Sequence, residues 1–257
     1  VFLLCAVASA GFLMLYSVAG GKLDPWARPQ MMRFALGLCV MFAIAMVDVR
    51  FWKAVSPLAY VVSFLLLLYV EMAGHVGMGA QRWINLGFMV LQPSEMMKIA
   101  LVMLLAAYYA WLDPAKVSRP LWVIPPLILI LAPVALVLTQ PDLGTSIMLL
   151  LGGGAVMFLA GVSLWYFGAA IAAAVGLVTM VFESRGTDWQ LLRDYQFNRI
   201  DTFLDPSKDP LGTGYHITQA QIALGSGGLS GRGYMQGTQS QLNFLPEKHT
   251  DFIFTTL

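Results

Sequence analysis

Residues 121–139 read LWVIPPLILILAPVALVLT, and no charged residue interrupts this stretch. A hydrocarbon core about 30 Å thick is crossed by about 20 apolar residues in a helix, so the segment is long enough to span a membrane. Only a helix satisfies its own backbone groups in lipid, because an isolated strand leaves them unpaired. The stretch therefore predicts a transmembrane helix and sets the fold class of the chain.

Similar apolar stretches recur along the chain. Of 257 residues, 58% are hydrophobic and 11% are charged, against about 25% charged in a typical soluble domain. The fold class is accordingly all-α, a polytopic membrane helix bundle, and the net charge of +1 gives no indication of a nucleic-acid partner. We expect seven spans and the start of an eighth, at about Val1–Ala19, Met31–Val49, Val55–Val70, Pro93–Leu112, Leu121–Thr139, Pro141–Ala160 and Val162–Phe182, and from near Thr250.

Between the seventh and eighth expected spans the composition changes. Residues 183–249 hold seven of the 14 acidic and six of the 15 basic residues, which makes this segment too polar to cross lipid. We expect one large loop on one side of the membrane. Counting spans puts four ionisable residues on the same side as that loop: Glu95, Lys98, Asp142 and Asp251.

The two ends of the chain bear on domain organisation. The chain starts at Val1 without a methionine, and it ends at Leu257, a few residues into another apolar segment. We therefore expect a single transmembrane domain, 1–257, that is a fragment of a longer protein truncated at both ends.

Proline and an acid occur together at expected helix starts. Gln92-Pro93-Ser94-Glu95 and Gln140-Pro141-Asp142 both suit a first helical turn, where proline fits and an acid complements the helix dipole. Lys98 lies three residues after Glu95, so the two share a helix face and can pair. The pair either holds helices together or presents Lys98 to an anionic substrate, with Glu95 orienting it. Asp142 is either a helix cap or a substrate contact.

The densest ionisable cluster precedes the eighth expected span. Glu247, Lys248 and Asp251 would crowd one face of a helix, and His249 lies among them. Partial burial raises a carboxylate pKa and a neighbouring lysine lowers it, and the balance of the two can hold a carboxylate ready to accept a proton near neutral pH. Asp251 is therefore the leading candidate for a general base. His249 is either a hydrogen-bonded structural group or a catalytic one.

The large loop contains a short amphipathic helix and then turns. Its Arg193 and Arg199 are either solvated charges or phosphate ligands, because a guanidinium offers a bidentate fork. The glycine-dense run 219–233 suggests backbone lying close to a ligand or to another segment.

Four ordered motifs together resemble one family. These motifs are the residues 92–98, 140–146 and 225–229, and the run His249-Thr250-Asp251-Phe252-Ile253-Phe254. They are similar to those of the SEDS family (shape, elongation, division, sporulation), and the runs 205–216 and 237–247 resemble its elongation branch, RodA, more than its division branch, FtsW. The resemblance implies the SEDS fold, which has ten spans in the family, of which about seven to eight are present here.

The resemblance also implies an activity. Members are peptidoglycan glycosyltransferases of the bacterial inner membrane that polymerise lipid II into glycan strands for cell elongation and cell shape. They work with a class B penicillin-binding protein and other elongation-complex membrane proteins. Asp251 matches the essential aspartate that follows the large extracytoplasmic loop, and Glu95, Lys98 and Asp142 match other functional positions.

From this resemblance a mechanism follows as a hypothesis. Asp251 acts as general base in an inverting transfer that releases undecaprenyl pyrophosphate. Lys98 and Arg199 stabilise the leaving group, and Lys248 and His249 complete the expected substrate-binding set. A divalent cation (Mg or Mn) is a candidate cofactor, although the sequence contains no carboxylate cage for a metal site.

Two other functions compete with this one. A lipid II flippase, a transporter, would also use intramembrane charges, but it should place them through the bilayer depth rather than at one face. A structural scaffold for the penicillin-binding protein would leave the cluster around Asp251 without a purpose.

Overall fold

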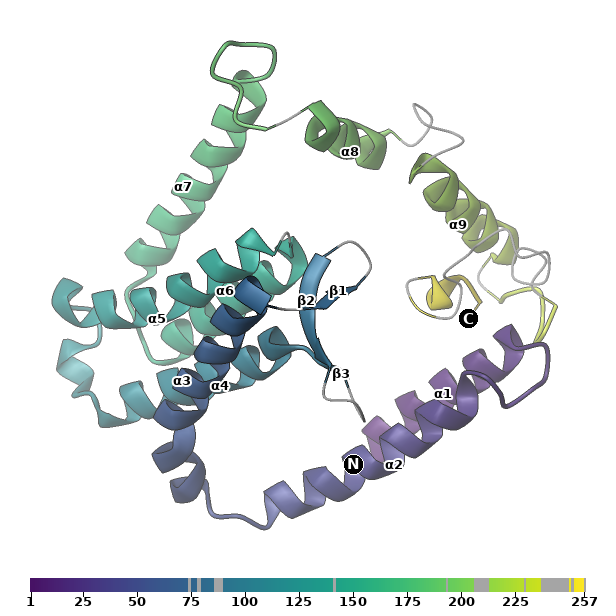
Figure 1. Ribbon diagram of the computed structural model, residues 1–257, viewed down its shortest axis with the longest axis horizontal. Helices are drawn as coiled ribbons and strands as arrows, with labels where there is room; N and C mark the ends of the chain where they lie inside the picture. The colour runs from purple at the N-terminus through teal and green to yellow at the C-terminus, as the bar shows by residue number, and fades with distance from the viewer. Residues whose placement is uncertain are drawn as a thin grey trace. The chain divides into compact units, whose positions relative to one another are not determined.

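The computed structural model describes residues 1–73, 75–77, 80–85, 90–140, 142–192, 194–205, 213–228, 230–236, 250 and 252–256. The chain divides into two compact units, one of residues 1–45 with 178–257 and the other of residues 46–177. Figure 1 gives the element labels used below.

The middle unit is a helical bundle. Its helices are α3 (Val49–Ala73), α4 (Pro93–Trp111), α5 (Pro120–Thr139), α6 (Leu143–Leu159) and most of α7 (Leu164–Glu183). Helices α3–α6 pack around a core that includes Leu67, Met97, Leu101 and Leu149, all with 1% or less of their surface exposed.

Helix α6 approaches its neighbours through two glycines. A Cβ on Gly153 would lie 2.5 Å from Cγ1 of Ile130 in α5, whereas one on Gly152 would lie 3.6 Å from Val102 in α4. Small residues at such crossings let helix backbones pack closely in a membrane. Gly153 therefore sets the distance between α5 and α6.

Prolines inside α3 and α5 leave backbone carbonyls without a helical hydrogen bond. Proline has no N–H to donate to the carbonyl of the residue four positions earlier. Pro133 leaves the carbonyl of Leu129 without its helical donor, and the Tyr60 hydroxyl of α3 donates to that oxygen at 2.8 Å. Pro126 does the same to the carbonyl of Trp122.

The hydroxyl of Tyr108 in α4 donates to the Trp122 oxygen at 2.8 Å. In α3, the carbonyl of Lys53 is freed by Pro57 and accepts from Ser56 Oγ, also at 2.8 Å. Side chains thus satisfy backbone carbonyls that the helices themselves leave without a donor.

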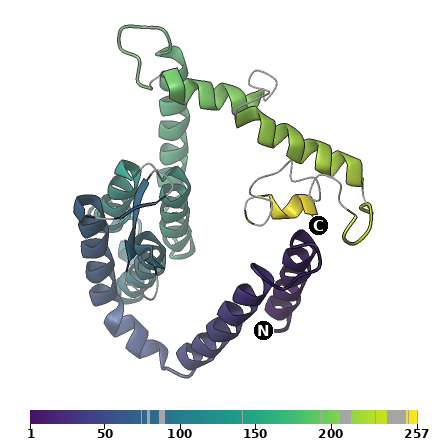
Figure 2. The same ribbon diagram turned by 45° about the vertical axis from the view of Figure 1, so that its right-hand side comes forward.

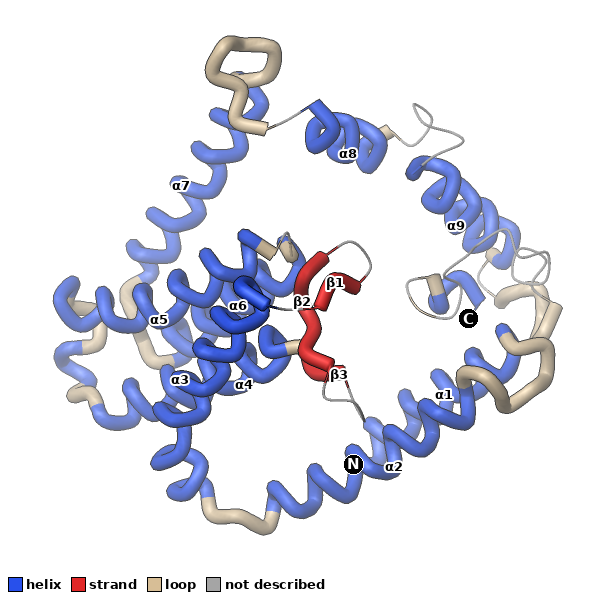
Figure 3. The backbone as a smooth tube through the Cα atoms, in the orientation of Figure 1, coloured by secondary structure: helices blue, strands red, loops and turns tan. Residues whose placement is uncertain are grey.

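Helix α4 is preceded by a small sheet that the sequence did not predict. Strands β1 (His75–Gly77), β2 (Ala80–Asn85) and β3 (Val90–Leu91) pair antiparallel in the order β1-β2-β3 (Figure 3). Ile84 lies opposite Leu91, so β3 delivers the chain directly to the start of α4 at Pro93.

The other unit contains both ends of the chain. Helices α1 (Phe2–Val18) and α2 (Ala27–Ala45) lie side by side, with the rings of Phe12 and Phe34 edge to face at 5.7 Å (Figure 2). The remaining elements are α8 (Asp194–Leu204), α9 (Thr213–Gly227) and a 3-10 helix, η3 (Ile253–Thr256).

The seven stretches predicted as spans are all helical. The largest difference from the predicted bounds is at the start of α3, which begins at Val49 rather than Val55, and η3 begins at Ile253, shortly after the expected start of the eighth span near Thr250. Three helices are long and apolar enough to cross a membrane by length and composition, over 49–72 and in α5 and α7, and the apolar α1 and α6 have 17 residues each. The predicted amphipathic helix of the large loop is α8.

The structure tests one of the two explanations for the glycine-dense run, close approach to another segment. The run is helical as far as Gly227, and a Cβ added at Gly225 or Gly227 would meet no atom within 4 Å among the described residues. Close approach to another described segment is therefore not the reason for these glycines.

Candidate functional site

The first group of predicted site residues lies at the start of α4. Gln92 caps the helix in an extended conformation, and Pro93 and Glu95 occupy its first turn. Lys98 Nζ lies 2.8 Å from Glu95 Oε1, which confirms the predicted pair. The side chain of Glu95 is 57% exposed and that of Lys98 31%, so the ammonium remains accessible to an anionic ligand.

Asp142 begins α6 as its N-cap. Its Oδ1 accepts from the Thr145 backbone N–H at 3.1 Å, and its Oδ2 accepts from the Thr145 hydroxyl at 2.9 Å. The Ser146 hydroxyl donates to the Asp142 carbonyl at 2.8 Å. The capping role weighed from the sequence is thus present. The substrate contact stays a prediction.

The two groups lie at the same end of the bundle. Short connections join α4 to α5 and α5 to α6, so α5 runs opposite to both neighbours, and α4 and α6 start at one end. Helices α4 and α6 are in direct contact. An accessible ammonium and two carboxylates therefore come from adjacent helix starts, each of which also carries the positive end of a helix dipole.

The cluster before the eighth span falls outside the described residues. Lys248, His249 and Asp251 belong to it, and their predicted roles stay predictions. The described neighbours are Thr250 and the 3-10 helix η3 that begins at Ile253.

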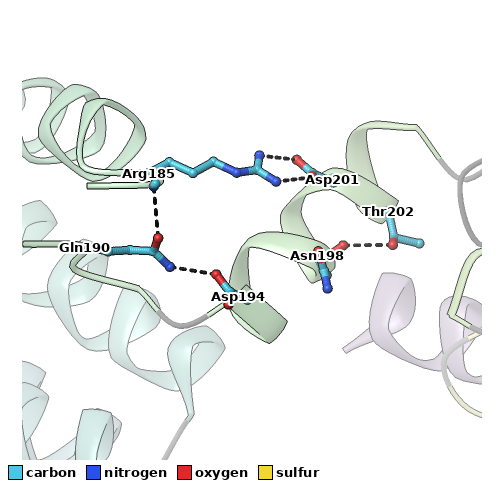
Figure 4. A network of polar contacts seen from close by, with 7 residues as sticks. Arg185, Gln190, Asp194, Asn198, Asp201 and Thr202 are labelled. Atoms are coloured by element: carbon cyan, nitrogen blue, oxygen red, sulfur yellow. Dashed lines mark hydrogen bonds and ion pairs between the residues drawn. The ribbon is translucent and has the colours of Figure 1, made fainter. Parts of the chain in front are cut away.

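Arg199 lies on α8, although its side chain is outside the description. A polar network that the sequence did not predict holds this helix. Arg185 donates to both carboxylate oxygens of Asp201, at 3.1 and 2.7 Å (Figure 4). The guanidinium also lies 5.0 Å from the ring centroid of Phe197, which is 1% exposed. The hydrogen bond with Asp201 is the main cause that raises the pKa of Arg185 above its ordinary value.

Gln190 extends the network to the start of α8. Its Oε1 accepts from the Gly186 backbone N–H at 3.0 Å, and its Nε2 donates to Asp194 at 2.9 Å (Figure 4). The turn after α7 is therefore fixed to both halves of α8, and with it the backbone that carries Arg199. Sixteen residues separate Arg185 from Asp201, a spacing that carries no periodic signal.

The described residues contain no group of three or more His, Cys, Asp or Glu side chains that could hold a metal ion. Glu95 and Asp142 have polar partners in Lys98 and Thr145.

One protein family matches the whole chain. Residues 1–257 match the family of cell cycle proteins FtsW, RodA and SpoVE. The peptidoglycan glycosyltransferase MrdB of Escherichia coli is 39% identical over 99% of this chain and 66% of its own length. The chain thus spans slightly less than two thirds of that relative.

Two solved structures share the fold. One, described as showing structural coordination of polymerization and crosslinking by a peptidoglycan synthase complex, has a TM-score of 0.73 at 33% identity, covering 89% of this chain and 65% of its own. The rod shape determining protein RodA of Thermus thermophilus has a TM-score of 0.59 at 28% identity, covering 74% and 63%. The chain therefore belongs to the SEDS family of FtsW, RodA and SpoVE and is a polytopic membrane protein with that family's helical fold.

Proposed function

We propose that this chain is the membrane part of a peptidoglycan glycosyltransferase that polymerises lipid II during cell elongation. The observation that carries the proposal is the pair of adjacent helix starts, where Lys98, held by Glu95 at 2.8 Å, lies at the same end of the bundle as Asp142. The 39% identity to a relative named as a peptidoglycan glycosyltransferase supports the same reaction.

The proposed reaction is one inverting displacement. Asp251 accepts the proton of the 4-hydroxyl on the acceptor's N-acetylglucosamine, and that oxygen forms a bond to the anomeric carbon of the donor's N-acetylmuramic acid. The bond from that carbon to the phosphate oxygen breaks, and its electron pair leaves with undecaprenyl pyrophosphate. No enzyme nucleophile is needed, because a single displacement forms no covalent intermediate.

Charge on the leaving group requires fixed cations. Lys98 is suited to this role because the ion pair with Glu95 restricts its position while leaving the ammonium accessible to a pyrophosphate. Arg199 is the second candidate, since the Arg185–Asp201 network fixes the helix that carries it. Lys248, His249 and Asp142 would contact the sugar and phosphate groups around these cations. Mg²⁺ or Mn²⁺ remains a candidate addition to the same charges.

The expected setting is the bacterial inner membrane. The loop 183–249 and the active site would face the extracytoplasmic side, where glycan strands are assembled. A class B penicillin-binding protein is the expected partner, together with other elongation-complex proteins and the membrane lipid. A solved structural relative described as a peptidoglycan synthase complex supports such a partner.

Polymerisation in detergent tests the proposal against a flippase. Purified full-length protein with its penicillin-binding partner is given lipid II in micelles, where no second compartment exists. A polymerase yields glycan strands and undecaprenyl pyrophosphate. Absence of polymer, together with lipid II translocation across vesicles by the same preparation, would favour the transporter instead.

A further inference from the structure

A cavity of about 470 Å³ lies within the unit that contains both chain ends. Helix α1 supplies Phe12 to its wall, α2 supplies Arg33 and Phe34, and the segment before and inside η3 supplies Thr250 and Ile253. Most of the wall is apolar. Arg33 is the only charged residue among the described residues that line it.

Arg33 supplies the positive charge of this wall. It lies six residues into α2, about 9 Å along the helix from Ala27 at 1.5 Å per residue, and close to the start of the apolar stretch expected from Met31 to Val49. Its side chain is exposed, and it forms no ion pair within the described part of the chain. An exposed guanidinium beside an apolar cavity suits a ligand that joins an anionic group to an apolar chain.

The position of the cavity indicates which anion. Thr250 immediately precedes Asp251, and Ile253 follows it by two residues, so the cavity wall is continuous along the chain with the proposed general base. The proposed reaction releases an apolar chain bearing a pyrophosphate. A guanidinium offers a bidentate fork to phosphate oxygens, and apolar walls suit the first carbons of the chain.

The size is consistent with that ligand. A volume of about 470 Å³ lies within the range of about 300–1,000 Å³ that is typical of small-molecule pockets. A pyrophosphate and its first isoprene unit are small enough for such a pocket, and the rest of the chain would continue into lipid.

We infer that this cavity binds the pyrophosphate end of the polyprenyl lipid, with Arg33 as its phosphate ligand. The inference rests on the proposed function. Arg33 would be a phosphate-binding residue in addition to Lys98, and it belongs to none of the four motifs that indicated the family.

The test measures binding of farnesyl pyrophosphate to the full-length protein in detergent, without any polymerisation. Arg33→Gln should weaken binding at least about tenfold, which corresponds to about 1.4 kcal/mol. Arg28→Gln is the matched control. Arg28 lies on the same helix but outside the cavity lining, 3.9 Å from Asp24, so its removal should leave the affinity unchanged.

A second pair of variants tests the cavity by volume. Gly11 lines the cavity and has open space where its Cβ would be, so Gly11→Leu should fill it and abolish binding without a clash. Gly37 on α2 also has open space but does not line the cavity, and Gly37→Leu should bind as wild type does.

The outcomes separate this site from its alternatives. Equal affinity in wild type and Arg33→Gln would overturn the inference, as would equal competition by phosphatidylglycerol, which would make the cavity a bulk phospholipid site. Farnesol should bind weakly and without dependence on Arg33. Binding that depends on Arg33 in a preparation that makes no polymer would retain the site and reject the proposed function.

Discussion

The hydrogen bond from Tyr60 to the Leu129 carbonyl should stabilise the bundle only because Pro133 is present. Tyr60 is 8% exposed, and its hydroxyl lies 2.8 Å from an oxygen whose helical donor is absent. Tyr60→Phe leaves that carbonyl unsatisfied while keeping the ring stacked on Phe64 at 6.1 Å. Hydrogen bonds between membrane helices contribute about 0.6 kcal/mol on average and up to about 1.7. We expect the free energy of unfolding to fall by about 1 kcal/mol, because no water is available to hydrogen-bond the Leu129 carbonyl in place of Tyr60.

A double-mutant cycle tests the cause. Pro133→Ala restores an N–H that can donate to Leu129, so in that background Tyr60→Phe should cost only a few tenths of a kcal/mol. The free energy of unfolding is measured on the full-length protein by titrating mixed micelles with a denaturing detergent. Tyr109→Phe is the matched control, because the Tyr109 hydroxyl is buried with no hydrogen-bond partner among the described residues, and its removal should not destabilise. Additive effects of Tyr60→Phe and Pro133→Ala would refute the reasoning.

Two further predictions concern α6. Gly153→Ala places a Cβ 2.5 Å from Ile130 and should destabilise the bundle by about 1–3 kcal/mol. Gly152→Ala places its Cβ 3.6 Å from Val102 and should be tolerated. The same unfolding titration compares the two variants, and equal stabilities would contradict the close crossing of α5 and α6. Asp142→Ala should lower the free energy of unfolding by about 1 kcal/mol through loss of the helix cap. Asp142→Asn should retain most of the stability, because asparagine also caps helices. A loss of polymerisation in a stable Asp142→Asn protein would therefore assign the carboxylate to substrate binding.

Much of the fold follows from local sequence signals. The helices were predictable because a long apolar segment in lipid satisfies its backbone groups only as a helix. The starts of α4 and α6 were predictable because proline and an acid mark a first helical turn. The Glu95–Lys98 pair follows from a three-residue spacing on one helix face.

Other features depend on contacts between distant residues. The sheet of β1–β3 is held by antiparallel pairing rather than by apolar length, so no span signal reveals it. Arg185 meets Asp201 only because the chain turns back after α7. Arg33 lines a cavity only because α1, α2 and the segment around η3 come together, and residues so far apart in the sequence carry no local signal of that contact. The hydrogen bonds from the Tyr60 and Tyr108 hydroxyls to carbonyls of α5 form only because α3 and α4 pack against α5.

The most direct test of the central claim is lipid II polymerisation by the full-length protein with its penicillin-binding partner, comparing wild type with Asp251→Ala. Loss of a general base reduces such rates by about 10²–10⁴-fold. Asp188→Ala, which removes an exposed acid from the same expected loop, is the control and should remain fully active. We predict polymer from wild type and Asp188→Ala but none from Asp251→Ala at equal folded protein; equal polymer from all three would contradict the assignment of Asp251 as the base.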